Sequence, residues 1–217
     1  MATAKTKDEE LALPSFWDQR YLNSDGEHPT HEWFKTFESL KPFFTKHLLA
    51  KKAPDTSPCI LHLGCGDSTI PIDLLSLGYE NQTCIDFSSV VIQLMSQRHA
   101  DKPKLKWAVG DVQDMPQILT GAVDVAFDKG TLDAMISGSL WDPPDPVKTM
   151  IKRYIDEVVR VLKPGGLFLY ITYRQPHFMK PFLTRERIWD LIVEDLEDEK
   201  GSFGYFGFIM TKAGDSP

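Results

Sequence analysis

The sequence predicts an α/β fold in which helices cover both faces of a doubly wound, mainly parallel sheet. Short apolar runs alternate along the chain with longer stretches whose apolar residues recur at helical spacing, which is typical of β-α-β units. Several of these runs end directly in glycine or aspartate, as at Gly64 and Asp86. Parallel strands bring such ends to one edge of a sheet, where folds of this class bind ligands.

The composition predicts one globular domain and excludes several classes of protein. The chain has 217 residues, a formal net charge of -7 and 42% hydrophobic residues. An excess of acidic residues argues against a nucleic-acid-binding protein, because phosphate binding needs an excess of cations. No apolar run reaches the roughly 18 residues that a membrane span needs, and the three cysteines show neither a metal-binding nor a disulfide pattern. We therefore expect a cytoplasmic protein with no metal, no membrane and no direct nucleic-acid partner.

The amino-terminal part of the chain is expected to divide into a tail and an arm. Residues 1–13 are small, charged and polar, so they predict a flexible tail ahead of a single domain over 14–217. An aromatic arm over 14–50 opens this domain, and from 31 to about 49 its apolar residues recur at helical spacing. Residues 54–58 predict a linker that leads into the sheet.

Strands and helices are expected to alternate from there on. The predicted strands cover residues 59–63, 83–86, 104–109, 123–128 and 167–173. The predicted helices are one capped by Ser68 or Thr69 that runs to Leu77, one over 90–99 capped by Ser88 or Ser89, and one from Val147 to Leu162. A last strand over 205–211 follows a glycine-rich turn and is expected to pair in reverse as an edge strand.

The turn after the first strand, Gly64-Cys65-Gly66, is the first candidate binding element. Glycines let the backbone approach a ligand closely, and the following helix offers unpaired N–H groups. A dinucleotide fingerprint would need a third glycine at the position of Thr69, so a nicotinamide cofactor is disfavoured. A smaller anion, such as the carboxylate of an amino acid, still fits. A tight turn without any ligand is the alternative.

Three aspartates end the next strands, and each has a functional and a structural interpretation. Asp86 is suited to accept hydrogen bonds from both hydroxyls of a ribose, or else to stabilise the dipole of the helix that follows it. Asp111, with the N–H of Val112, is suited to the edge of an adenine, or else to an Asx turn. Asp128 lies at the same ligand-binding edge, or else caps a helix near Thr131. In series, these strand ends outline a nucleoside site.

Longer segments of the chain are more selective than single strand ends. They are residues 16–21 (FWDQRY), 32–34, 60–68, 86–91, 128–134 (DKGTLDA) and 176–178. Together they resemble the class I, seven-strand methyltransferases that use S-adenosylmethionine, and within them the methyltransferase-like subfamily of elongation factor 1-alpha lysine methyltransferases. The resemblance implies a Rossmann-like, seven-stranded sheet, S-adenosylmethionine as cofactor and a protein-lysine acceptor, with elongation factor 1-alpha or a similar protein as partner.

The resemblance also implies roles for single residues. Those implied at the cofactor are Trp17, Tyr21 and Trp33 from the arm, Gly64 and Gly66 at its methionine part, Asp86 and Phe87 at the ribose and adenine, Asp111 and Val112 at the adenine edge, and Lys129 as a further contact. For the three arm aromatics, a hydrophobic lid packed on the sheet is the alternative.

Further expectations concern the acceptor side, one core residue and an acidic surface run. Asp128 is assigned to positioning of the acceptor amine, with a general base as the second interpretation, and His177 is a candidate for the same mouth. His62, where many class I enzymes carry an acid, is expected to face the core rather than a ligand. The acidic run 194–199 is expected to be a solvated helix end. A small-molecule acceptor, or a cofactor-binding protein without turnover, remain the alternative functions.

Overall fold

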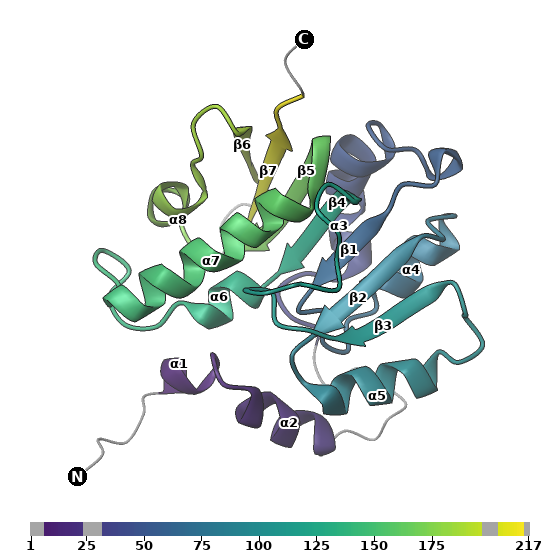
Figure 1. The fold of residues 1–217 in the computed structure, drawn as a ribbon, viewed down its shortest axis with the longest axis horizontal. Helices are drawn as coiled ribbons and strands as arrows, with labels where there is room; N and C mark the ends of the chain where they lie inside the picture. The colour runs from purple at the N-terminus through teal and green to yellow at the C-terminus, as the bar shows by residue number, and fades with distance from the viewer. Residues whose placement is uncertain (1–6, 24–31, 197–203, 215–217) are drawn as a thin grey trace.

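The computed structural model describes residues 7–23, 32–196 and 204–214, and a seven-stranded sheet lies at its centre (Figure 1). The strand order is β3-β2-β1-β4-β5-β7-β6. The strands are β1 (Ile60–Leu63), β2 (Gln82–Asp86), β3 (Leu105–Val109), β4 (Val123–Lys129), β5 (Leu162–Thr172), β6 (Trp189–Asp195) and β7 (Phe206–Lys212). β1 to β5 pair in parallel, whereas β7 is antiparallel to both of its neighbours. The predicted fold class is confirmed.

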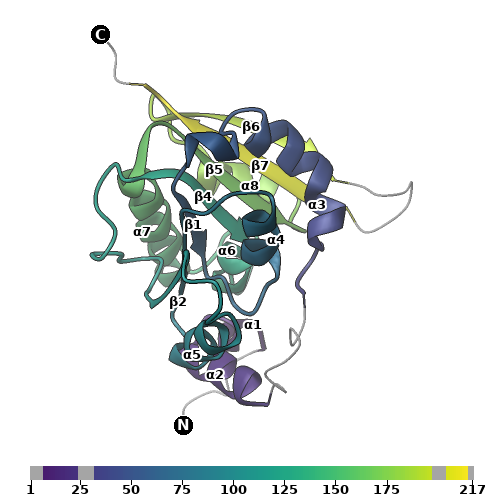
Figure 2. The same cartoon turned by 90° about the vertical axis from the view of Figure 1, so that its right-hand side faces the viewer.

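Helices cover both faces of this sheet, and in Figure 2 α7 and α3 lie on opposite sides of it. The helices are α1 (Lys7–Glu10), α2 (Pro14–Leu22), α3 (Phe37–Phe44), α4 (Ile70–Ser76), α5 (Ser89–Arg98), α6 (Thr131–Met135), α7 (Asp145–Val161) and α8 (Pro176–Leu183). A π-helical turn, Thr45–Leu49, continues α3, and a 3-10 turn, Pro54–Thr56, leads to β1. No helix among the described residues combines the length and the hydropathy that crossing a bilayer requires.

Alternating side chains of the central strands build two separate cores. In β5, Phe168 and Tyr170 pack with α6, α7 and α8, while Leu169 and Ile171 pack with α3 and α4. Successive side chains of a strand point to opposite faces, so a strand buried on both sides is apolar throughout. A third, smaller cluster joins α2 and α5 through Tyr21 and Val91. These layers leave the carboxyl ends of β1 to β4 free for a site.

The carboxyl-terminal part of the sheet contains a strand that the sequence analysis does not predict. β6 takes the edge position, so β7, correctly predicted to pair in reverse, lies between β5 and β6. The prediction of a helix end at the acidic run is wrong for Glu194 and Asp195, which belong to β6. Charged side chains on an edge strand oppose pairing with further strands, which accounts for acidic residues in this strand. Residues 197–199 of the run lie outside the described residues.

The arm also differs from its prediction. Helix α3 begins at Phe37 rather than near residue 31, because the hydroxyl of Thr36 caps it by accepting from the N–H of Ser39 at 3.4 Å. Trp33 and Phe34 therefore lie on a loop, and Phe34 has a left-handed φ of 64°. Within the predicted tail, Lys7–Glu10 forms the short helix α1.

Candidate functional site

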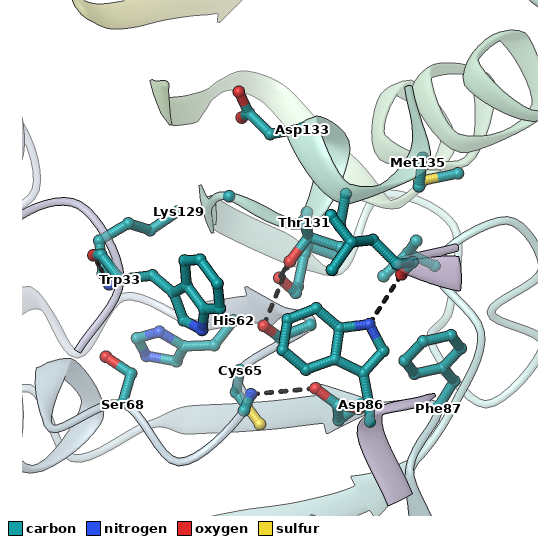
Figure 3. A pocket seen from close by; sticks show the side chains of 18 of the residues that line it. Trp33, His62, Cys65, Ser68, Asp86, Phe87, Lys129, Thr131, Asp133 and Met135 are labelled. Carbon is teal, nitrogen blue, oxygen red and sulfur yellow. Dashed lines mark hydrogen bonds between the residues drawn. The ribbon is translucent and has the colours of Figure 1, made fainter. Parts of the chain in front are cut away.

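A pocket of about 410 Å³ lies at the carboxyl ends of β1 to β4 and is roofed by the arm (Figure 3). Pockets of this size are sufficient for a small-molecule cofactor. All ten residues predicted to bind the cofactor line it: Trp17, Tyr21, Trp33, Gly64, Gly66, Asp86, Phe87, Asp111, Val112 and Lys129. Sequence positions that are far apart thus meet in one cavity.

The turn after β1 forms the floor of the pocket and depends on its glycines. Gly64 has a φ of 61°, and a Cβ placed on it would lie 2.2 Å from Oγ1 of Thr131. That hydroxyl donates to the carbonyl oxygen of Leu63 at 2.8 Å, which fixes α6 against the turn. Gly66 has a φ of 51°, and its Cβ would lie 2.8 Å from the hydroxyl of Tyr21. Only glycine fits these two positions, and the backbone is left open toward the pocket.

Asp86 lies at the end of β2 and ties the turn to α5. Its carboxylate accepts from the N–H of Gly66 at 3.0 Å and from the N–H of Ser88 at 2.9 Å. Burial raises the pKa of Asp86 to about 6. The side chain is 4% exposed and lines the pocket, so it serves the fold and faces the ligand space at once.

Asp111 lies one strand further along and is exposed at the rim of the pocket. Its carboxylate accepts from the N–H of Gln113 at 2.9 Å, which is the Asx turn that the structural interpretation expects. The side-chain amide of Gln113 also donates to this carboxylate, at 3.3 and 3.4 Å from its two oxygens, while the residue stays exposed. The turn therefore fixes a side chain that a ligand is able to reach.

Aromatic side chains of the arm form the roof. Trp17 stacks on Tyr21 with ring centroids 6.0 Å apart and meets Trp33 edge-on at 5.8 Å. The indole N–H of Trp17 donates to the carbonyl oxygen of Leu11 at 2.7 Å. The roof is thus both a packed lid and a pocket wall, so the two interpretations of the aromatic arm do not exclude each other.

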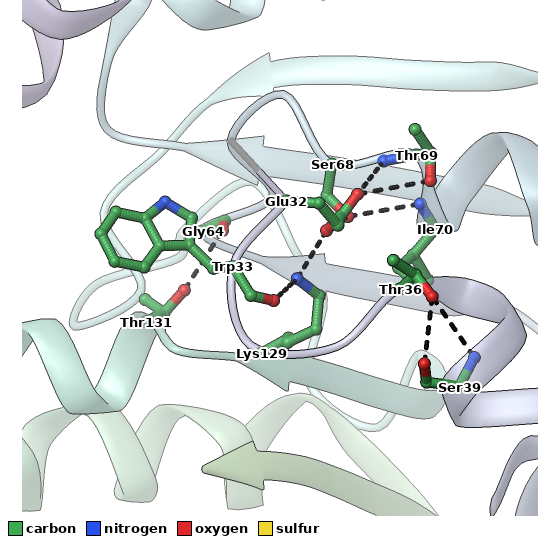
Figure 4. A network of polar contacts seen from close by, with 10 residues as sticks. All are labelled: Glu32, Trp33, Thr36, Ser39, Gly64, Ser68, Thr69, Ile70, Lys129 and Thr131. Carbon is green, nitrogen blue, oxygen red and sulfur yellow. Dashed lines mark hydrogen bonds and ion pairs between the residues drawn. The ribbon is translucent and has the colours of Figure 1, made fainter. Parts of the chain in front are cut away.

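Lys129 is the last residue of β4, and its side chain points toward the arm (Figure 4). Its ammonium donates to the carboxylate of Glu32 and to the carbonyl oxygen of Trp33, both at 2.6 Å. Burial lowers the pKa of Lys129, although the neighbouring Glu32 opposes this shift. In the sequence, Glu32 is part of the 32–34 motif, and no role is predicted for it. Its partners lie far away in sequence, and the motif was the only signal for it.

The prediction that Asp128 positions an acceptor amine does not agree with the structure. Asp128 is fully buried and does not line the pocket. Its carboxylate accepts from the N–H groups of Thr131 and Leu132 and from the hydroxyl of Tyr154, at 2.8, 3.0 and 2.7 Å. These bonds satisfy both oxygens and hold the start of α6. The helix-capping alternative is therefore the correct one.

Asp133 lines the pocket instead, although it enters the sequence prediction only as part of the 128–134 segment. It accepts from the hydroxyls of Tyr170 at 2.7 Å and Thr172 at 2.6 Å, and Nε of Arg174 lies 3.4 Å from it. Burial raises the pKa of Asp133 to about 6. In Figure 3 its carboxylate points away from the other labelled side chains. Asp133 thus joins α6 to β5 at the wall of the pocket.

The two predicted histidines differ in their placement. His62 is buried as expected, and its Nε2 lies 2.6 Å from Oε1 of Gln82. The amide nitrogen of Gln82 is committed to two carbonyl groups, so His62 is the donor, and burial lowers its pKa to about 4. The ring also lines the pocket, which the sequence analysis does not expect. His177 is exposed, packs against Phe178 and does not line the pocket, so the structure gives no support to a role at the acceptor.

Comparison with known proteins adds the family. Residues 61–170, about half of the chain, match the model of a methyltransferase domain. The chain belongs to this family. Within the described residues, no group of three histidine, cysteine, aspartate or glutamate side chains is arranged to hold a metal ion.

Curated relatives of this methyltransferase-domain chain carry related names. EEF1A lysine methyltransferase 4 of Mus musculus is 37% identical over 171 residues, which cover 75% of this chain and 62% of the relative. The eEF1A lysine and N-terminal methyltransferase of Bos taurus is 28% identical over 216 residues, covering 94% of this chain and 29% of the relative. The chain thus spans less than two thirds of the relatives' length.

Solved structures agree on the fold of the methyltransferase domain. The N-methyltransferase NodS of Bradyrhizobium japonicum, solved with S-adenosyl-l-homocysteine, has a TM-score of 0.63 at 15% identity. The match covers 90% of this chain and 96% of NodS. At this identity the likeness establishes the shared architecture.

Proposed function

We propose that this protein transfers a methyl group from S-adenosylmethionine to a lysine side chain of a protein. The observation that carries the proposal is that the glycine turn, Asp86 and Asp111 line one pocket beneath the aromatic side chains of the arm. The names of the relatives support a lysine acceptor, and elongation factor 1-alpha is the first protein to test. A cytoplasmic location belongs to the same proposal, because the three cysteines are free thiols, as in a reducing compartment.

The residues of the pocket fit the two ends of such a cofactor. Asp86, Phe87 and Asp111 suit a nucleoside, while the glycine turn leaves backbone space for an amino-acid end. When bound, the cofactor supplies an electrophilic methyl group on a positively charged sulfur. The face of Trp17 attracts a nearby cation by about 0.5–2 kcal/mol, whereas Arg20 already lies over the ring of Trp33, 5.2 Å from its centroid. This chain contributes mainly binding and alignment, which supply much of the acceleration of a displacement reaction.

The acceptor side of the pocket lies between the arm and the end of β5. Phe34 and Tyr173 both line the pocket there, and their rings meet edge-on at 5.4 Å. Deprotonating a lysine of pKa 10.4 at pH 7 costs about 4.6 kcal/mol, and an apolar wall lowers this cost because it disfavours the ammonium form. The wall also suits the aliphatic part of a lysine side chain.

Incubation with tritiated S-adenosylmethionine and purified elongation factor 1-alpha tests the function. We expect label on the acceptor protein and a mass increase that maps to lysine. Gly64→Ala serves as the inactive control, because its Cβ would clash with Thr131. Label confined to small molecules of a cell lysate would instead favour a small-molecule acceptor. Tight cofactor binding without transfer to any acceptor would favour a binding protein, and calorimetry against NAD checks the class of cofactor.

A further inference from the structure

Glu32 lies at the centre of a buried network that joins the arm to the pocket floor (Figure 4). One carboxylate oxygen accepts from the hydroxyl of Ser68 at 2.8 Å and from the ammonium of Lys129 at 2.6 Å. The other accepts from the N–H and the hydroxyl of Thr69, at 2.9 and 3.3 Å. The side chains of Lys129 and Glu32 are only 5% and 16% exposed. One carboxylate thus contacts both the segment after β1 and the end of β4.

The network fixes the position of the arm through specific polar contacts. Lys129 is a buried cation whose hydrogen-bond acceptors, Glu32 and Trp33, both belong to the arm. If the arm moved away, this ammonium would lose its counter-ion, and the N–H of Thr69 would lose its acceptor. A buried charge without a partner is strongly unfavourable. The arm is therefore held by one well-defined contact as well as by apolar packing.

The residues directly after Glu32 also make contacts that fix the arm. Trp33 lines the pocket beside the glycine turn, and Phe34 lies on Gly130, where a Cβ would come within 3.1 Å of its ring. Phe34 adopts a left-handed φ of 64°, a conformation that a bulky residue holds only when its surroundings fix it. At the other end of the arm, the carboxylate of Asp18 accepts from the hydroxyl of Ser88 at 2.6 Å. The arm is thus fixed on both sides of the pocket.

We propose that Glu32 is a positioning residue that closes the arm over the pocket, so that arm closure and pocket occupancy are linked. A ligand held between the arm and the strand ends contacts both, so it binds the closed arrangement more tightly than an open one. By mass action, ligand binding then favours the closed arrangement, and loss of closure lowers the affinity for the ligand. The identity of the ligand rests on the proposed function, whereas closure of the free protein does not.

Hydrogen exchange of the free, full-length protein tests the closure. In Glu32→Ala we expect the Thr69 amide and the amides of residues 33–36 to exchange at least tenfold faster than in the wild type. Lys129→Met should accelerate the same amides, and the double variant should be no more than about twofold faster than either single one, because both act through one contact. Glu38→Ala is the matched control, since Glu38 pairs with Lys41 on the exposed surface of the same arm. Unchanged Thr69 exchange in Glu32→Ala, or fully additive effects, would overturn the proposal.

Calorimetry with S-adenosylhomocysteine tests the linkage. We expect binding to Glu32→Ala to be at least tenfold weaker, and the amides of residues 33–36 in the wild type to slow when the ligand is present. Equal affinity in the variant would overturn the linkage. If the wild type binds no S-adenosylhomocysteine, the proposed function fails, while exchange in the free protein still decides the role of Glu32. Glu32→Gln, which keeps an acceptor for the Thr69 N–H, replaces the alanine variant if that variant unfolds.

Discussion

At the residue scale, Asp128 shows what a buried carboxylate does for the start of a short helix. Its oxygens take up two N–H groups of α6 and the hydroxyl of Tyr154 on α7. We expect Asp128→Ala to lower the free energy of unfolding by about 3 kcal/mol, because three buried donors lose their acceptor. Urea denaturation measures this loss, and Tyr154→Phe, which removes one donor only, should cost less. Wild-type stability with abolished turnover would contradict this structural role.

The same carboxylate makes stability depend on pH. Burial raises the pKa of Asp128 to about 7, far above its value in an unfolded chain. Between about pH 4 and 7 the folded state therefore holds a proton that the unfolded state has lost, so this group lowers stability as pH rises, by at most about 1.4 kcal/mol per pH unit. Asp128→Asn should make the decline from pH 5 to 6.5 shallower. Parallel curves for the two proteins in urea denaturation would refute the raised pKa.

Some site residues could be predicted from the sequence because their setting is local. Gly64 and Asp86 end apolar runs, and strand ends of parallel sheets gather ligands. The direction of the Asp128 side chain could not be predicted, because it depends on Tyr154 in a distant helix. The role of Glu32 could not be predicted from its motif alone, since its partners Ser68 and Lys129 come together only through the fold.

At the element scale, Ser88 serves two helices at once. Its oxygen accepts from the N–H of Val91 at 3.3 Å to cap α5, and its hydroxyl donates to Asp18 on α2 at 2.6 Å. We expect Ser88→Ala to lower the free energy of unfolding by about 1 kcal/mol, the usual cost of a lost cap. Thermal unfolding checks the value. Asp18→Ala, which leaves the cap intact, should cost less, and an equal cost in both variants would mean that the cap contributes nothing.

Most elements of the sheet could be predicted because strands buried on both faces are continuous apolar runs. β6 could not, because its exposed face carries Ile192 as well as Asp190, so exposure alternates along this edge strand while the apolar residues do not. The start of α3 was misplaced for a different reason. Trp33 and Phe34 fit the helical spacing of the residues after them, but the cap at Thr36 and the contacts of the arm exclude them from the helix.

At the scale of the whole molecule, the part of the arm before Phe37 and the sheet have separable roles. The two large cores consist of residues from Phe37 onward, whereas Tyr21 contributes to the small cluster on α5. Removal of residues 1–35 should therefore leave a cooperatively unfolding sheet, while affinity for S-adenosylhomocysteine falls at least tenfold because the roof is missing. Circular dichroism and calorimetry measure the two effects. Loss of cooperative unfolding would show that the arm belongs to the folding unit.

The strand order also constrains how the protein is made. β7 follows β6 in the chain yet lies between β5 and β6. During synthesis, β6 leaves the ribosome without a partner, and the open edge of β5 exposes Tyr170 and Ile171 until residues 206–212 emerge. Open strand edges and exposed apolar surface favour aggregation. A nascent chain from which β6 has emerged but β7 has not is therefore expected to need a chaperone, whereas one from which β7 has also emerged is able to complete its sheet.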